Sequence, residues 1–202
     1  MIPDLSPIFT AYEKLRDQVD GIFAQVLASQ GPERVTCRKG CSDCCHALFD
    51  LTLVEAMYIS KAFGKTFGFG PERSAILERA SEVDRRLARL KRDLFREEKK
   101  GIAPESIMKE AAGERMRCPL LGDDGLCALY DARPITCRIY GIPTVIAGQG
   151  HVCGLSGFDK KLAAAAPDSE VLTGLAIRGA DCQNDRDGVE QKVSEWLNGL
   201  GY

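Results

Sequence analysis

The chain has 202 residues, of which 45% are hydrophobic and 28% charged, a composition typical of a globular protein able to bury a sizeable core. Its net charge of -2 gives no general reason to bind nucleic acid or an anionic membrane, because both require a basic excess on one face. The first residues show no signal-peptide pattern, and no apolar run approaches the ~18 residues of a membrane span. We therefore expect a cytoplasmic protein with neither nucleic acid nor membrane as a partner.

Two long amphipathic helices are predicted, over residues 4–29 and 72–99. In each, apolar side chains recur every three or four residues and so form one stripe. The stripes consist of Ile8, Tyr12, Leu15, Val19, Ile22 and Val26, and of Ile76, Ala80, Val83, Leu87, Leu90 and Leu94. We interpret both as the core of a small helical bundle. A coiled coil with a protein partner is the alternative, although neither stripe exceeds about four heptads.

Shorter helices are predicted between and after these two. The segment Thr52-Leu-Val-Glu55 has the form of a capping box and predicts a helix that ends at Gly64. Further helices are expected over residues 104–113 and 187–199.

The segment from 115 to 157 has an irregular pattern. Turns are predicted at Gly122-Asp-Asp-Gly125 and at Gly148-Gln-Gly150. The predicted fold is therefore mainly α, a single domain over 1–202 in which a helical bundle carries an irregular cysteine-rich metal-binding region.

Within this segment Asp131 is a candidate N-cap for a short helix through Cys137 and Tyr140, with Pro134 in its first turn. On such a helix Arg133 and Cys137 share a face at i and i+4. Arg133 would then either offset thiolate charge or hold a small anionic ligand.

Eight of the nine cysteines fall into two groups, and only Cys182 is left over. A reducing compartment disfavours structural disulfides, and an isolated buried cysteine is usually a small hydrophobe. Four thiols within nine residues instead indicate ligation, because short spacings let one loop wrap thiolates around an ion or cluster. The candidate metal ligands are Cys37, Cys41, Cys44, Cys45, Cys118, Cys127, Cys137 and Cys153.

The neighbours of these cysteines add detail to the hypothesis. Consecutive Cys44 and Cys45 are expected to point in different directions, so either two neighbouring sites share the eight thiols or only some of them bind. Both histidines, His46 and His151, lie near a cysteine and are candidate ligands or hydrogen-bond donors to ligands. Cations beside the cysteines would lower thiol pKa values, with solvated surface charge as the alternative: Arg38, Lys39, Arg117 and Arg138.

The spacing Cys37-x3-Cys41-x2-Cys44 is also that of radical S-adenosylmethionine enzymes. Asp43 stands where those enzymes have an aromatic residue, and the α/β alternation of their fold is missing. The sequence therefore argues against that superfamily, while the spacing still suits an iron-sulfur cluster.

Two motifs resemble a known family. The first block reads Cys37-Arg-Lys-Gly-Cys-Ser-Asp-Cys-Cys45 and is followed by Leu51-Thr-Leu-Val-Glu-Ala56; the second includes Cys118-Pro-Leu-Leu121, Cys127-Ala-Leu-Tyr130, Arg133-Pro134 and Cys137-Arg-Ile-Tyr140. Over residues 37–153 the chain is similar to the cysteine-cluster family of zinc- or iron-chelating domain proteins. The resemblance implies a bound metal. Some relatives are linked to flagellin lysine methylation with an iron-sulfur cluster, which implies that an enzymatic role is open.

These observations predict a cysteine-ligated metalloprotein that carries a [4Fe-4S] cluster, with zinc as the alternative, in redox or in metal or cluster handling. An iron-sulfur-dependent enzyme is the second hypothesis, and a structural zinc module that binds a protein partner is the third.

Overall fold

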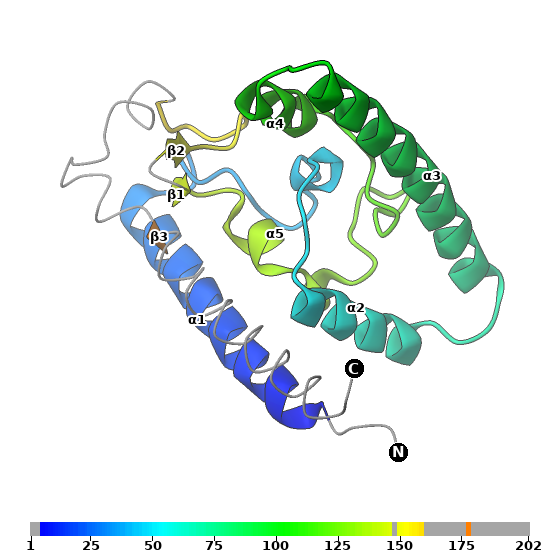
Figure 1. Cartoon of the computed structure of the whole chain (residues 1–202). Helices are drawn as coiled ribbons and strands as arrows, with labels where there is room; N and C mark the ends of the chain where they lie inside the picture. Colours follow the sequence, from blue (N-terminus) through cyan, green and yellow to red (C-terminus); the bar gives the residue numbers. More distant parts are fainter. Residues whose placement is uncertain (1–4, 147–148, 160–176, 179–202) are drawn as a thin grey trace. The chain divides into compact units, whose positions relative to one another are not determined.

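The computed structural model describes residues 5–146, 149–159 and 177–178 (Figure 1). The described chain is mainly helical, which confirms the predicted fold class. Its α-helices are α1 (Ser6–Gln30), α2 (Leu53–Thr66), α3 (Pro71–Lys99), α4 (Pro104–Gly113) and α5 (Ile135–Ile139). Short 3-10 turns occupy Cys44–His46 and Tyr130–Ala132. None of the described helices combines the length and the apolar character needed to span a bilayer.

The chain divides into two compact units. Unit 1 comprises Met1–Arg38, Leu51–Ile59 and Arg133–Tyr202, and unit 2 comprises Lys39–Asp50 and Ser60–Ala132. The predicted C-terminal helix over 187–199 and the leftover Cys182 lie outside the described residues.

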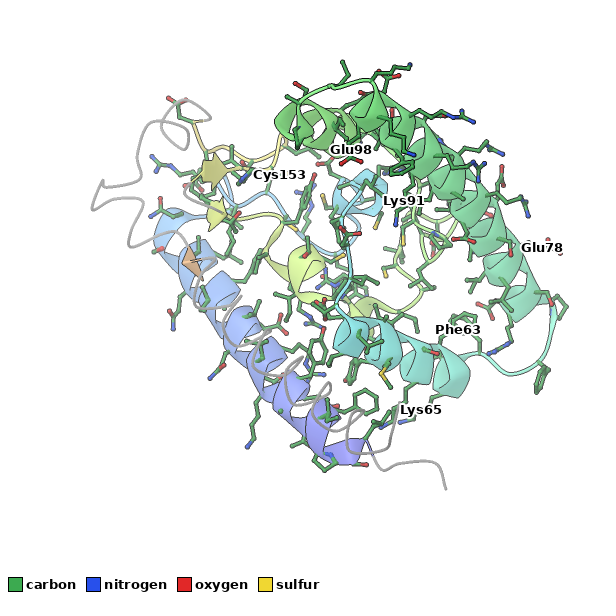
Figure 2. The ribbon with its side chains drawn as sticks, viewed as in Figure 1. Phe63, Lys65, Glu78, Lys91, Glu98 and Cys153 are labelled. Carbon is green, nitrogen blue, oxygen red and sulfur yellow. The ribbon has the colours of Figure 1, made fainter. Side chains whose placement is uncertain are left out.

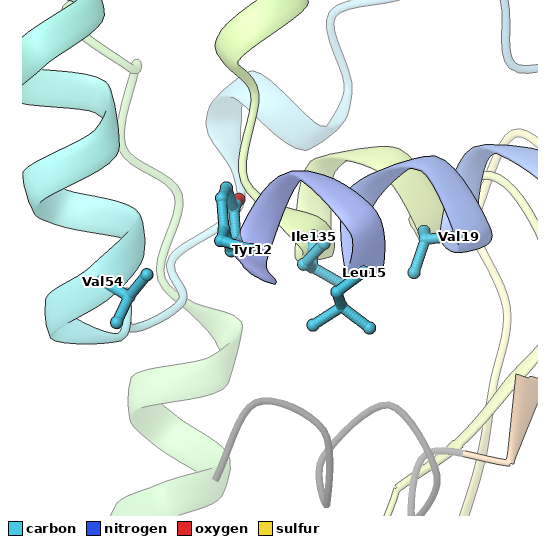
Figure 3. Close-up of a cluster of buried hydrophobic side chains, with 5 residues drawn as sticks. All are labelled: Tyr12, Leu15, Val19, Val54 and Ile135. Atoms are coloured by element: carbon cyan, nitrogen blue, oxygen red, sulfur yellow. The ribbon is translucent and has the colours of Figure 1, made fainter. Parts of the chain in front are cut away.

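The core of unit 1 forms where α1 packs on α5 and on the start of α2. One cluster of buried side chains joins the three helices and consists of Tyr12, Leu15, Val19, Val54 and Ile135 (Figure 3). A second cluster consists of Val26, Val35 and Ile142. The predicted stripe of the first helix is thus confirmed, because Ile8 and Ile22 also pack against these clusters as partly buried side chains.

Helix α2 begins with the predicted capping box. The Glu55 amide donates to Thr52 Oγ1 at 3.3 Å, and the Thr52 amide donates to Glu55 Oε2 at 3.0 Å. These reciprocal bonds satisfy backbone donors that the first turn leaves without helical partners. The helix continues through Gly64 to Thr66, so its predicted end was two residues too early.

Three short strands follow α5 in unit 1. Strand β1 (Thr144–Ile146) pairs antiparallel with β2 (Gln149–His151) and parallel with β3 (Ile177–Arg178). The predicted turn at Gly148–Gly150 is wrong in part, because Gln149 and Gly150 lie in β2. A three-residue strand is too short for its alternation to be read from sequence.

Unit 2 contains α3 and α4, each predicted as a helix, and the two pack on each other. Charged side chains cover α3 along its length, among them Glu78, Lys91 and Glu98 (Figure 2). On its predicted stripe Ile76 is buried, and the other five members are half-buried. The chain leaves α3 through Gly101 at a φ of 86°, a conformation that glycine adopts without steric cost.

Candidate metal centre

The end of the first cysteine block, with Cys44 and Cys45, winds into a single 3-10 turn in unit 2. The Cys45 amide donates to the Ser42 carbonyl and the His46 amide to the Asp43 carbonyl, each at 3.0 Å. The Arg115 guanidinium holds the same turn from outside through an ion pair of 2.7 Å with Asp43. The turn therefore fixes the backbone at Cys44 and Cys45.

Backbone hydrogen bonds join this turn to the second block. The Cys118 amide donates to the Cys45 carbonyl at 2.7 Å, and the Met116 amide donates to the His46 carbonyl at 3.0 Å. Ala47 and Arg115 form an antiparallel bridge beside them. Cysteines about seventy residues apart in sequence are thus brought together by the main chain.

A tight turn brings Cys127 back toward Cys118. The Gly122 amide donates to the Leu126 carbonyl at 2.8 Å, and Leu121 and Cys127 form an antiparallel bridge. Gly125 has a φ of 76°, in the left-handed region that favours glycine. The predicted turn at Gly122–Gly125 is confirmed, and it acts as a hairpin that carries a cysteine on each arm.

Cys41 belongs to unit 2, and the residues just before it contact the hairpin and the segment that follows it. Lys39 Nζ lies 5.7 Å from the centroid of the Tyr130 ring, and a β-carbon on Gly40 would lie 3.9 Å from Leu126 Cδ2. Residues 39–40, just before Cys41, therefore run along the segment that contains Cys127.

Two thiols of unit 2, Cys45 and Cys118, have pKa values above that of an ordinary thiol. A hydrogen bond with the Cys44 thiol is the main cause that raises the pKa of Cys45, and burial and the charges of Cys44, Cys118 and Cys127 add to it. Burial is the main cause that raises the pKa of Cys118, with Cys127 and Cys44 adding to it, against a lowering by hydrogen bonds from the backbone at Leu120 and Leu121. A bound cation would reverse these shifts.

Cys44 and Cys45 both lie in the short 3-10 turn Cys44–His46. The turn fixes their backbone, and the expectation that the two consecutive side chains point in different directions stays a prediction.

The other three described cysteines belong to unit 1. A β-carbon on Gly141 would collide with Cys37 Cβ, so Cys37 lies directly against the backbone that follows α5. Thr36 Oγ1 donates to the Leu155 carbonyl at 2.8 Å, and the Leu155 amide donates to Cys153 Sγ at 3.4 Å. These contacts join the segment that carries Cys37 to the segment that carries Cys153. Figure 2 labels Cys153.

Helix α5, which carries Cys137, starts later than predicted. Asp131 belongs to the 3-10 turn Tyr130–Ala132, and Pro134 occupies the N-cap of α5. A proline disfavours helical backbone in the residue before it, so the turn cannot run on into the helix. Arg133 is therefore not in α5, and the predicted i, i+4 relation between Arg133 and Cys137 is wrong.

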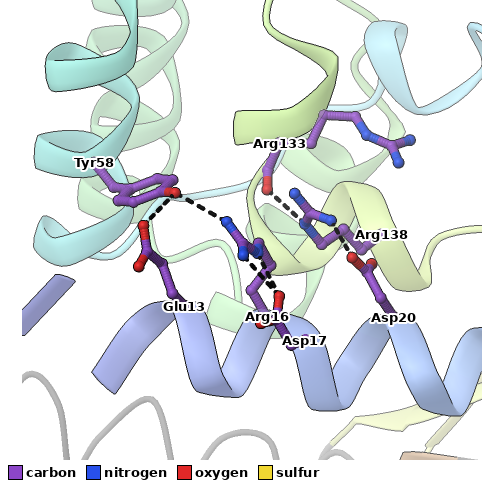
Figure 4. Close-up of polar contacts among 7 residues, drawn as sticks. All are labelled: Glu13, Arg16, Asp17, Asp20, Tyr58, Arg133 and Arg138. Atoms are coloured by element: carbon purple, nitrogen blue, oxygen red, sulfur yellow. Dashed lines mark hydrogen bonds and ion pairs between the residues drawn. The ribbon is translucent and has the colours of Figure 1, made fainter. Parts of the chain in front are cut away.

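The side chain of Arg138 anchors α5 to α1. Its Nη1 donates to Asp20 Oδ2 at 2.6 Å and its Nε donates to the Arg133 carbonyl at 2.9 Å (Figure 4). Arg117, in unit 2, pairs with Asp123 at 3.3 Å. Two of the cations that flank cysteines in the sequence are thus engaged by carboxylates.

The donor chemistry fits a zinc or iron-sulfur centre, although the thiols are not gathered around one point. Among the described residues, no three His, Cys, Asp or Glu side chains are arranged so that they could hold a metal ion as they stand. Thiols become ligands by losing their protons, and they commonly reorient as metal binds. An all-sulfur set with no carboxylate among it is the set that zinc and iron-sulfur clusters prefer.

The two histidines differ in their surroundings. His46 Nδ1 lies 3.0 Å from the Ser42 carbonyl, within the turn that carries Cys44 and Cys45. A backbone contact of this kind leaves Nε2 as the acceptor nitrogen. His151 is exposed at the end of β2.

Sequence reasoning missed the contact of the buried Glu55 carboxylate with the helix that carries Cys137. Glu55 Oε1 accepts a hydrogen bond of 2.9 Å from the Ile135 amide, at the start of the helix that carries Cys137. The capping-box pattern explains why a glutamate stands at this position, and the second contact has no local sequence signal.

A family model described as "Putative zinc- or iron-chelating domain" matches residues 36–154. The chain belongs to this family. The matched segment contains all eight clustered cysteines and the capping box of α2. No curated protein and no solved structure matches the chain.

Proposed function

We propose that this member of the family is a metalloprotein whose cysteine thiolates hold a [4Fe-4S] cluster that serves in redox or in metal or cluster handling. The ligands are drawn from Cys37, Cys41, Cys44, Cys45, Cys118, Cys127, Cys137 and Cys153. The matched family supports metal binding, and the abundance of thiols in the matched segment supports a cluster.

One observation carries the proposal: main-chain hydrogen bonds in unit 2 hold Cys45 beside Cys118, and the hairpin brings Cys127 back toward Cys118. Cys45 and Cys118 both have a raised pKa, and each is affected by Cys44 and Cys127. Four partly or fully buried sulfur atoms are costly to ionise together without a cation. A metal centre removes the cost, because it replaces the protons and is held by the resulting thiolates.

A structural zinc centre is the second candidate, and the backbone pairing of Cys45 with Cys118 favours it. Sulfur ligands of a single tetrahedral zinc at about 2.3 Å from the ion lie within about 4 Å of each other. The main chain already keeps the segments of Cys45 and Cys118 adjacent, through the hydrogen bond of 2.7 Å from the Cys118 amide to the Cys45 carbonyl. In this case the unit 2 thiols Cys44, Cys45, Cys118 and Cys127 supply four ligands, and the site is closed.

Anaerobic purification of the full chain tests the proposal. Under the cluster hypothesis the protein is brown and contains iron and acid-labile sulfide. Stoichiometric zinc without sulfide would establish the second candidate instead. Protein that binds neither metal, even after reconstitution with each under reducing conditions, would contradict both.

Serine variants then separate ligands from bystanders. Cys118→Ser and Cys127→Ser should each lower the metal content, because the remaining thiols cannot complete the site. The matched control is Cys182→Ser, outside both cysteine groups, which should keep its full metal content. A loss of metal in the control would show that the ligand set is wrongly assigned.

A further inference from the structure

We infer that Glu55 is the positioning residue for Cys137: its buried carboxylate holds the N-terminus of the helix that carries this thiol. The inference rests on the proposed function, because it takes Cys137 as one of the metal ligands. It concerns only unit 1, to which both residues belong.

The Glu55 carboxylate serves the start of two helices at once. Oε2 accepts from the Thr52 amide at 3.0 Å and from Thr52 Oγ1 at 2.9 Å, and Oε1 accepts from the Ile135 amide at 2.9 Å. The residue is 1% exposed, so these bonds are shielded from water. The bonds to Thr52 complete the cap of α2, whereas the bond to Ile135 has no role in α2.

Helix α5 needs an external cap. It has five residues, Ile135–Ile139, far fewer than an isolated helix needs for stability. Its N-cap residue is Pro134, which makes no side-chain cap hydrogen bond. The first amides of a helix lack internal acceptors and carry partial positive charge, so an anionic oxygen placed there satisfies both needs. Glu55 supplies this oxygen from a segment 80 residues earlier.

The remaining contacts of α5 fix its rotation. Ile135 is buried in the core cluster, Ile139 packs against it, and Arg138 is bonded to Asp20 on α1. These three residues lie on one face of the helix, and Cys137 lies roughly 200° around it from Ile135. The Glu55 bond adds a hydrogen bond between a side chain and the backbone at the start of α5. Cys137, two residues later, would move directly with any shift of that backbone.

A purely structural role for Glu55, as the cap of α2, predicts a different outcome from a positioning role. Thr52→Val separates them, because it keeps the side-chain shape, removes both hydrogen bonds of the Thr52 hydroxyl and leaves the Glu55–Ile135 bond in place. Glu55→Gln keeps the size of the side chain. Its terminal NH2 group can only donate, so the variant loses the bond to Ile135 or the bonds to Thr52. Glu55→Ala removes all three bonds.

The experiment uses the full-length, metal-free, reduced protein, with Co²⁺ alone as the probe. Thiolate-to-cobalt charge-transfer absorption reports how many sulfur ligands are bound. Wild type and Thr52→Val should give the same spectrum, and Cys137→Ser should lose intensity. Glu55→Gln and Glu55→Ala should also lose intensity and bind Co²⁺ roughly tenfold to a hundredfold more weakly, the usual effect of removing a group that orients a metal ligand. Amide hydrogen exchange of the metal-free Glu55→Gln protein should be faster at Ile135 than in wild type.

Each possible result is decisive. Wild-type affinity and spectrum in both Glu55 variants would overturn the inference while leaving the proposed function intact. An equal loss of charge-transfer intensity in Thr52→Val would assign the effect to the cap of α2. An unchanged spectrum in Cys137→Ser would show that this thiol is not a ligand. Either result overturns the inference. Absence of charge transfer in wild type would overturn the proposed function and the inference with it. If Glu55→Ala fails to fold, Glu55→Gln supplies the result.

Discussion

Replacement of Tyr12 by phenylalanine should stabilise the protein, whereas the same replacement at Tyr58 should destabilise it. The two rings pack together in unit 1 with their centroids 5.0 Å apart. The Tyr58 hydroxyl donates to Glu13 Oε1 and accepts from Arg16 Nη1, each at 2.9 Å (Figure 4). The Tyr12 hydroxyl is buried and has no hydrogen-bond partner among the described residues. The pair is therefore a matched test of one chemical change.

The magnitudes follow from the state of each hydroxyl. A buried hydroxyl without a partner costs about 1–3 kcal/mol, so Tyr12→Phe should raise the free energy of unfolding by about 1 kcal/mol once side-chain relaxation is allowed for. Tyr58→Phe loses two hydrogen bonds to charged groups, but the network is only partly buried, so the expected loss is about 1 kcal/mol.

Urea unfolding followed by circular dichroism measures both changes. The two variants should differ by about 2 kcal/mol, which for a chain of this length corresponds to a separation in Tm of about 4–8 °C. A loss of stability in Tyr12→Phe that equals the loss in Tyr58→Phe would refute the reasoning, because it would mean that the Tyr12 hydroxyl has a partner such as a buried water.

The same residue predicts how stability depends on alkaline pH. Burial is the main cause that raises the pKa of Tyr12 above its ordinary value near 10, and the neighbouring Glu55 carboxylate adds to the shift. The native state therefore prefers the protonated phenol. This contribution is fully present below about pH 10 and is lost as pH rises from there through the higher native pKa. The stability of Tyr12→Phe should fall less steeply than that of wild type above pH 10 in the same urea assay.

Three further expectations concern the surroundings of the cysteines. Asp20→Asn should cost about 1–2 kcal/mol in urea unfolding, because the Arg138 side chain is only 5% exposed and would lose its carboxylate, while Asp20 itself is 48% exposed; an unchanged stability would show that the pair is not formed. Gly141→Ala should destabilise by about 1–3 kcal/mol, because the new methyl group collides with Cys37 Cβ; a wild-type melting temperature would contradict this packing. Removal of metal with a chelator should accelerate proteolysis within residues 115–127, because this segment has no helix and its hairpin carries the candidate ligands Cys118 and Cys127; equal cleavage rates with and without metal would argue against a metal-stabilised segment.

The long helices could be predicted because their information is local. Periodic apolar residues define α1 and α3 to within two residues at each end, and the capping box of α2 is visible in four consecutive residues. The end of α2 was missed because a glycine lowers helix stability without necessarily ending the helix, and packing carried the helix through Gly64.

The start of α5 could not be predicted from local sequence. Asp131 is a favoured N-cap residue, and Pro134 fits the first turn that would follow it. The helix begins after Pro134, which disfavours helical backbone at Arg133, and its first amide, that of Ile135, donates to Glu55 from 80 residues earlier. Contacts between distant segments leave no periodic pattern in the sequence. The sequence could therefore indicate candidate cysteine ligands, but not the contacts that hold the helix carrying Cys137.

The main-chain pairing between Cys45 and Cys118 affects how metal is acquired. For two ligand groups joined by a flexible connection, capture by the second group slows as the connection lengthens, since the effective concentration falls with loop length. Here the amide of Cys118 already donates a hydrogen bond to the carbonyl of Cys45. The length of the connection between them, about seventy residues, therefore no longer sets the effective concentration of the second ligand group. An ion held by the Cys44–Cys45 turn finds the thiol of Cys118 at a concentration that the backbone fixes in advance. The rate of metal binding would then be limited by deprotonation of the thiols and not by closure of a long loop.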